Sequence, residues 1–102
     1  MFINLVEFPP IEPTKDRAFR EWFAWSNSVY ERFPGFISRR LLKATAEPGR
    51  YWAIVEHDSE ATFMAMHTSP ERAEVWAKVE PLLAGKPVPR FLDVVETSAV
   101  AG

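Results

Sequence analysis

Two polar side chains lie where they could take part in catalysis. Asn4 belongs to an alternating run, on the strand face that also carries Phe2, Val6 and Phe8. A buried amide costs free energy unless it is paired, so Asn4 either bonds a neighbouring group or points at a ligand. His67 is a candidate base, because imidazole titrates near neutrality. The alternative for His67 is a solvated histidine at a helix end.

Aromatic side chains are the other unusual feature. They make up 14% of the 102 residues, with four Trp and eight Phe, which is more than a core of this size requires. A planar substrate could stack between them, although plain core packing explains at least half of them equally well. The candidate substrate-binding residues are Trp22, Phe23, Ser26, Tyr30, Met66 and Trp76.

Composition excludes several other classes of function. His57 and His67 have no organised carboxylates around them, so no metal site is expected. The absence of cysteine excludes a thiolate site and fits a reducing compartment such as the cytoplasm. Net charge is -2, with no basic cluster beyond Arg39 and Arg40, so nucleic acid is not an expected partner. No apolar run approaches the roughly 20 residues that span a bilayer, so no membrane association is expected.

Hydrophobic periodicity predicts the elements that position these residues. Spacings of three and four predict a helix from residue 15 to about 32, with Thr14 as its N-cap. A short helix to residue 66 follows Asp58 or Ser59, with Asp58 favoured as the cap. A longer helix begins at Ser69-Pro70 and runs to about residue 83, where Gly85 suits its end. Strand patterns cover residues 2–8, 36–45, 50–57 and 88–96.

This order predicts an α+β fold of the ferredoxin-like βαββαβ type, with one four-stranded antiparallel sheet. A single domain would span residues 1–96, followed by a frayed tail at 97–102. The helices cover one face of such a sheet, yet the other face is apolar too. A second copy packed sheet to sheet would cover it, so we expect a homodimer that closes an α+β barrel.

Two runs of residues carry a resemblance to a known family. The first runs from Phe33-Pro34-Gly35-Phe36 through Leu41-Leu42 to Arg50-Tyr51-Trp52, and the second is His57-Asp58-Ser59-Glu60 followed by Phe63. With these runs, most of the chain resembles the antibiotic biosynthesis monooxygenase (ABM) family, of the dimeric α/β-barrel superfamily. The resemblance implies a small cavity between sheet and helices in each subunit. It also implies oxidation of polycyclic aromatics or quinols by molecular oxygen without a metal.

The haem-degrading branch of that family is similar through residues 31–59. Asn4 and Phe23 match its site pattern. The branch's tryptophan falls at Met66 and its iron-ligating histidine near Val75, and the basic residues that would hold the propionates fall on uncharged positions. We therefore expect no cofactor, with haem as the alternative.

Three functions remain open from the sequence. The first is a cofactor-independent monooxygenase for a small aromatic or quinol-type substrate, in which Asn4 orients the oxygenated centre and His67 acts as the base. The second is haem binding or haem degradation. The third is a dimeric barrel that binds a small molecule without turnover.

Overall fold

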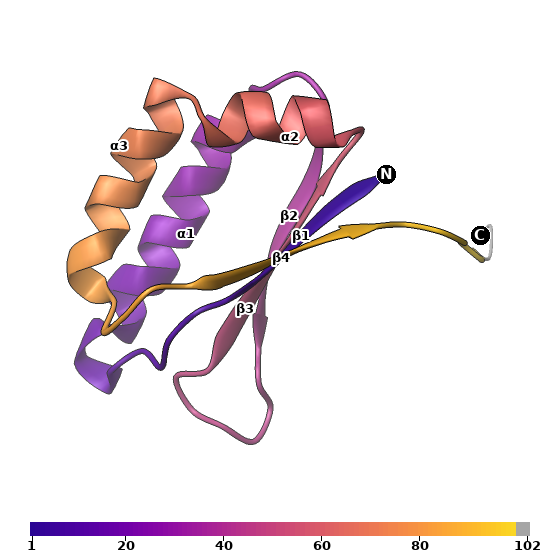
Figure 1. The fold of residues 1–102 in the computed structure, drawn as a ribbon. Helices are drawn as coiled ribbons and strands as arrows, with labels where there is room; N and C mark the ends of the chain where they lie inside the picture. Colours follow the sequence, from indigo (N-terminus) through magenta and orange to yellow (C-terminus); the bar gives the residue numbers. More distant parts are fainter. Residues whose placement is uncertain (100–102) are drawn as a thin grey trace.

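A computed structural model describes residues 1–99 of the chain (Figure 1). Its elements are β1 (Phe2–Glu7), α1 (Asp16–Tyr30), β2 (Phe36–Lys43), β3 (Tyr51–His57), α2 (Glu60–His67), α3 (Pro70–Val79) and β4 (Val88–Asp93), with 3-10 turns η1 (Pro13–Lys15) and η2 (Glu80–Leu82). The four strands form one antiparallel sheet in the order β2-β3-β1-β4. The predicted α+β ferredoxin-like fold is confirmed.

All three α-helices lie on one face of the sheet (Figure 1). α1 and α3 run side by side, and α2 crosses beyond the end of β3. None of the helices among residues 1–99 is long and apolar enough to cross a membrane. Of the predicted tail at 97–102, residues 97–99 are exposed without regular structure, and 100–102 lie outside the described residues.

The strand register sorts side chains between the two faces. In the β1–β3 pair, Asn4 lies opposite Val55, and Val6 lies opposite Ala53. These four residues face the helices, because directly opposed residues of an antiparallel pair point to the same side. The inner face of the sheet centre is therefore lined by small side chains and one amide.

A register shift changes the facing of β2. Phe36 lies opposite His57, at the start of the pairing with β3. Regular pairing would put Ser38, two residues later, opposite Val55, but it lies opposite Glu56. Ile37 is therefore an extra residue, as in a β-bulge. The alternation of the strand is thereby reset by one position.

The shift decides which of two adjacent arginines faces the helices. Arg39 lies opposite Val55 on the inner face, and Arg40 lies opposite Ile54 on the outer face. Simple alternation from the inward-facing Phe36 would have given the reverse arrangement. The irregular pairing thus brings a cation under the helices.

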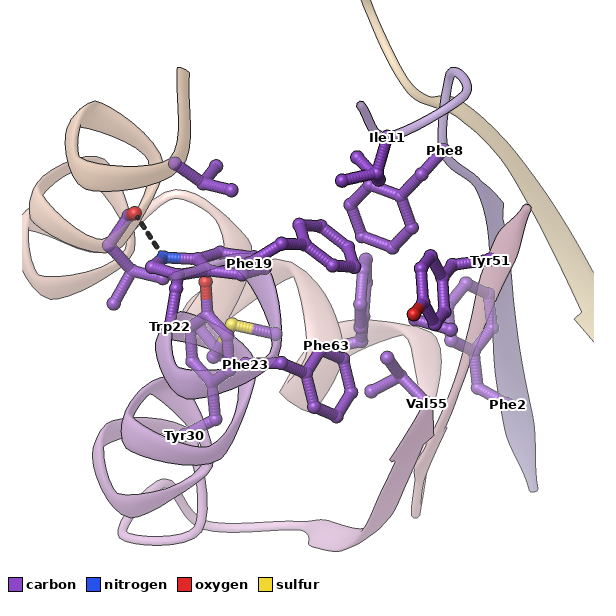
Figure 2. Close-up of a cluster of buried hydrophobic side chains, with 14 residues drawn as sticks. Phe2, Phe8, Ile11, Phe19, Trp22, Phe23, Tyr30, Tyr51, Val55 and Phe63 are labelled. Carbon is purple, nitrogen blue, oxygen red and sulfur yellow. Dashed lines mark hydrogen bonds between the residues drawn. The ribbon is translucent and has the colours of Figure 1, made fainter. Parts of the chain in front are cut away.

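An aromatic core joins the helices to the sheet (Figure 2). The ring centroids of Phe8 and Phe19 are 5.0 Å apart, and those of Phe19 and Tyr51 are 5.2 Å apart. The indole N–H of Trp22 donates to the carbonyl oxygen of Val75 at 3.0 Å, which ties α1 to α3 (dashed line in Figure 2). Rings that touch edge-on or tilted hold one another in place as well as burying apolar area.

The helix starts differ in part from prediction. Ser69 caps α3 as expected, with its hydroxyl accepting from the backbone N–H of Arg72 at 3.1 Å. The favoured cap of α2, Asp58, is wrong, because Ser59 makes the capping contacts. Thr14 is also wrong as the cap of α1, since it lies inside the 3-10 turn η1 and makes no cap hydrogen bond.

Five elements end earlier than the sequence predicts: β1, α1 and β2 by one or two residues, and α3 and β4 by three or four. α3 stops at Val79 rather than near residue 83, because Pro81 has no N–H to continue the helical hydrogen bonds and a 3-10 turn follows. β4 stops at Asp93 rather than 96, at the level of the first residue of β1, because Asp93 lies opposite Phe2. The last backbone bond between them runs from Val94 N–H to the carbonyl oxygen of Met1 at 3.0 Å.

The outer face of the sheet has no helix over it. Leu5 lies at its centre between Ile54 on β3 and Arg90 on β4, with Trp52 and Leu92 as diagonal neighbours. Leu92 is 47% exposed, and Leu5, Ile54 and Trp52 are partly buried by their neighbours. The single chain therefore presents an apolar sheet face to solvent.

Gly35 should resist substitution. Its φ is +84°, and a Cβ there would lie 2.5 Å from the side chain of Thr62 in the α2 capping box. We expect Gly35→Ala to lower the free energy of unfolding by about 2 to 3 kcal/mol, measured by urea denaturation. Gly85→Ala is the matched control, because its nearest atom is Pro9 Cβ at 3.9 Å, and it should change stability by less than about 0.5 kcal/mol. Equal losses in the two variants would contradict this account.

Candidate active site

A cavity of about 390 Å³ lies between the inner face of the sheet and the helices. This volume lies within the range of small-molecule sites. Asn4, Val6 and Val55 form its sheet side, and the segment before and into β4 closes one end with Lys86 and Pro89. Its other walls are largely aromatic or apolar, from Phe8, Trp22, Tyr30, Phe63, Met66 and Trp76.

Asn4 lies at the sheet side of this cavity. Its side chain is buried, with 6% of the residue exposed, and its Oδ1 atom has no hydrogen-bond partner among the described residues. Its cross-strand neighbours Val55 and Phe91 offer no side-chain polar group. An unpaired buried carbonyl costs about 1 to 3 kcal/mol, which a donor on a bound ligand would recover.

His67 ends α2 and also lines the cavity. Its ring stacks on Phe63, with centroids 5.3 Å apart. Burial lowers the pKa of His67, and the positive charge of Arg72 lowers it further. The imidazole is therefore neutral at pH 7, with one ring nitrogen free to accept a proton.

Arg39 reaches the cavity from β2. Its Nη1 donates to Ser26 Oγ at 2.5 Å, to Asn27 Oδ1 at 2.8 Å and to the Phe23 carbonyl at 3.4 Å. The guanidinium lies 3.9 Å from the centroid of Phe23 and 4.7 Å from that of Tyr30. Burial lowers the pKa of Arg39 to about 10, so the side chain keeps its charge at neutral pH.

Two more cations line the same cavity, Arg72 on α3 and Lys86 before β4. The guanidinium of Arg72 lies 5.5 Å from the ring centroid of Trp76. Tyr30 lies in the field of two arginines: burial raises the pKa of its hydroxyl, while the charges of Arg39 and Arg72 act to lower it. The cavity thus combines aromatic walls with positive charge.

The structure brings six of the eight residues predicted for the site to the cavity: Asn4, Trp22, Tyr30, Met66, His67 and Trp76. Phe23 and Ser26 lie behind the wall instead, where Phe23 packs under the guanidinium of Arg39 and Ser26 accepts its hydrogen bond. Their contacts orient the arginine.

Sequence reasoning missed the cations. Adjacent arginines on a strand must face opposite ways, but the sequence does not say which one faces inward, and the register shift in β2 reverses simple counting. Arg72 and Lys86 carry no local signal, because their place depends on how α3 and the segment after it pack.

The other histidine, His57, lies outside the cavity lining. It is 0% exposed, its Nδ1 lies 3.1 Å from Thr62 Oγ1, and its Nε2 has no partner among the described residues. Within residues 1–99, no three His, Asp or Glu side chains come together as a potential metal site.

Comparison with known protein families shows to which family this chain belongs. The sequence model of the family described as antibiotic biosynthesis monooxygenase matches residues 1–78. The chain belongs to the ABM family. At the level of the family, this places it among monooxygenases. A search of curated proteins finds no match.

Solved structures share the ABM fold over nearly the whole chain. A protein from Caulobacter crescentus, described as a "putative antibiotic biosynthesis monooxygenase", is 25% identical, with a TM-score of 0.80 over 93% of this chain and 91% of that one. A Deinococcus radiodurans protein of the same description is 11% identical, with a TM-score of 0.87 over 100% of both chains. Rv0793 from Mycobacterium tuberculosis is 16% identical, with a TM-score of 0.80 over 97% of this chain and 100% of that one. The last two similarities concern the fold alone.

His57 should make the stability of this ABM domain depend on pH. Burial lowers its pKa, with Asp58 opposing, so the unfolded chain takes up a proton at a higher pH than the folded one. The stability that neutral His57 contributes is therefore complete above about pH 6.5 and is lost as pH falls toward the folded pKa. We expect the melting temperature to fall between pH 7 and pH 5, and His57→Gln to flatten that profile.

His67 contributes in the same direction, because its pKa is lowered too. The profiles of His67→Gln and the double variant therefore separate the two histidines. Parallel profiles for the wild type and His57→Gln would show that folding does not change the pKa of His57. That result would overturn the assignment.

Proposed function

We propose that the chain is a cofactor-independent monooxygenase that oxidises a small phenol- or quinol-type aromatic compound with molecular oxygen. The observation that carries the proposal is the buried, unpaired amide oxygen of Asn4 in the same aromatic cavity as the neutral imidazole of His67. A buried acceptor without a partner suits a ligand hydroxyl. A neutral imidazole suits removal of a proton.

The reaction begins with transfer of the hydroxyl proton of the ring to His67. The electron-rich ring carbon then gives an electron pair to oxygen and forms a C–O bond to a peroxide. Loss of the C–H proton and cleavage of the O–O bond leave a carbonyl oxygen on the ring and one molecule of water. A phenol thus becomes a quinone, and the four electrons that reduce oxygen all come from the substrate.

The walls contribute by holding the ring and keeping water away. Trp22, Tyr30, Met66 and Trp76 present flat or flexible apolar surface to the cavity. Exclusion of water protects a reactive anion from reprotonation by solvent. In the bound substrate the amide oxygen of Asn4 accepts from the ring hydroxyl. Once that proton has passed to His67, the amide nitrogen donates to the phenolate oxygen or to the peroxide formed at another ring carbon.

Substitution of Asn4 and His67 tests these roles. Oxygen uptake with a panel of anthrols and quinols should fall about 100-fold in Asn4→Ala and by at least as much in His67→Gln. Asn4→Ala should keep the free energy of unfolding within about 1 kcal/mol, because it removes a group that is already unpaired. His57→Gln, which removes the histidine outside the cavity, should keep the rate. Full turnover in a folded Asn4→Ala protein would remove this residue from the mechanism.

Haem binding is the second candidate, because His67 and three cations share one cavity. An imidazole can ligate iron, and cations can pair with propionates. The position expected from the haem-degrading branch does not serve, since Val75 is apolar and its carbonyl oxygen is occupied by Trp22. Titration with haemin decides: a stoichiometric Soret shift that His67→Gln abolishes would favour haem, and oxygen uptake by haem-free protein would favour the first candidate. If neither the Soret shift nor oxygen uptake is observed, the protein is a binding protein without turnover.

We also propose that two copies pair through the outer face of the sheet, as expected from the sequence. That face is apolar at its centre around Leu5 and carries both signs of charge, with Arg40 and Arg90 beside Glu7 and Glu56. Such a face is complementary to itself across a two-fold axis. The segment after β4 extends away from the body of the chain with two valines exposed, Val94 at 37% and Val95 at 95% (Figure 1). A second copy would cover both features.

The dimer should be sensitive to charge at the centre of that face. Leu5→Glu would bury a carboxylate among the apolar side chains of the interface, where loss of its hydration costs more than a pair with Arg90 on β4 returns, so sedimentation velocity should show a monomer where the wild type is a dimer. Ala18→Glu adds the same charge at an exposed position of α1 and should stay dimeric. A wild type that sediments as a monomer would contradict the proposal.

A further inference from the structure

The charges around the cavity are all of one sign. Arg39, Arg72 and Lys86 line it, and no Asp or Glu among the described residues does. The whole chain has 14 acidic and 12 basic residues and a net charge of -2. The cavity is therefore a positive site in a weakly acidic protein.

These three cations have no carboxylate partner, which they share with Arg32, Lys43, Lys78 and Arg90 among the described residues, but of these seven they alone line the cavity. Arg20 pairs with Asp16 at 3.1 Å and Arg50 with Glu7 at 2.8 Å, and Arg17 and Arg40 have carboxylate partners as well. Within residues 1–99, no carboxylate lies within 4.0 Å of the charged nitrogens of the three cavity cations. Cations that the fold itself leaves without anions are available to an anionic ligand.

The geometry of Arg39 fits this role. Only Nη1 is used in its bonds to α1, whereas Nη2 and Nε have no partner among the described residues and remain accessible. The contacts with Phe23 and Ser26 fix the guanidinium in place before any ligand arrives. A planar guanidinium with free N–H groups pairs with a carboxylate through two parallel hydrogen bonds.

The shape of the site around Arg39 favours a flat anion. The guanidinium lies over the rings of Phe23 and Tyr30, and the ring centroid of Trp22 is 5.5 Å away. A carboxylate in the plane of an aromatic ring matches such surroundings better than a tetrahedral phosphate. The unpaired Oδ1 of Asn4 adds the need for a hydroxyl donor on the same ligand.

We propose that the cavity recognises a hydroxylated aromatic carboxylate, with the carboxylate on Arg39, in the field of Arg72 and Lys86, and the ring hydroxyl on Asn4. The inference rests on the proposed function in taking this ligand as the substrate that is oxidised. Arg39 is then the residue that determines specificity, and the two cations that accompany it raise the affinity for an anion.

Equilibrium binding to a matched set of ring compounds tests the proposal. The probes are 6-hydroxy-2-naphthoate, 2-naphthol and 6-hydroxy-2-naphthyl phosphate, titrated under anaerobic conditions by calorimetry with quenching of tryptophan fluorescence as a second signal. We expect the naphthoate to bind at least about tenfold more tightly than the naphthol, a difference of about 1.4 kcal/mol. The naphthoate should also bind more tightly than the phosphate.

Variants identify the source of that preference. Arg39→Met should remove the preference for naphthoate over naphthol, and Arg39→Lys should keep part of it. Arg17→Met, which removes the same charge from an exposed site on α1, should keep all of it. Should Arg39→Met fail to fold, Arg72→Met with Lys86→Met takes its place and should weaken the preference.

Equal affinity of the wild type for naphthoate and naphthol would overturn the proposal, and so would a preference that survives in folded Arg39→Met. A preference for the phosphate would replace the carboxylate by another anion and would also overturn it. Because binding is measured without oxygen, failed turnover would leave this result standing. A wild type that lacks the preference but still turns over would be a monooxygenase for neutral rings.

Discussion

The positive charge of Arg39 is the constraint on which the helix-facing side of this domain depends. A guanidinium partly withdrawn from water needs compensation, and no carboxylate in the described part of the chain supplies it. One helix supplies it instead, through oxygens of Phe23, Ser26 and Asn27 and through ring faces. Sliding of α1 along β2 would break these contacts together, so the charge fixes the position of the helix and, with it, the width of the cavity.

A second cost lies on the same face of the sheet, with Val55 on β3 between it and Arg39. The oxygen of Asn4 is buried without a partner, while the surrounding core is closely packed with rings and locked by the bond from Trp22 to Val75. Unsatisfied groups persist where the rest of the structure over-determines them, and they concentrate at functional sites. The well-packed aromatic core thus stabilises a domain that keeps an unpaired acceptor and accessible N–H groups facing a common space.

Periodicity and local chemistry were enough to predict the order of elements, the sheet and the facing of Asn4, because each depends on residues close together in sequence. The cap at Ser69 could be predicted for the same reason, whereas Thr14 failed because the prolines before it shift the chain into a 3-10 turn. The cationic half of the cavity could not be predicted. Arg39 faces inward through an irregular pairing, and Arg72 does so through the packing of a whole helix.

The bulge at Ile37 decides which side chains of β2 face the cavity. The bulge absorbs one residue: if Ile37 instead paired regularly with Glu56, every later residue of β2 would shift by one position and exchange faces until the next turn. Arg40 would turn toward the helices without the oxygens and rings that hold Arg39, and Leu41 would turn outward. Loss of the bulge, with every side chain in the strand unchanged, would therefore exchange this charged pocket for a different one.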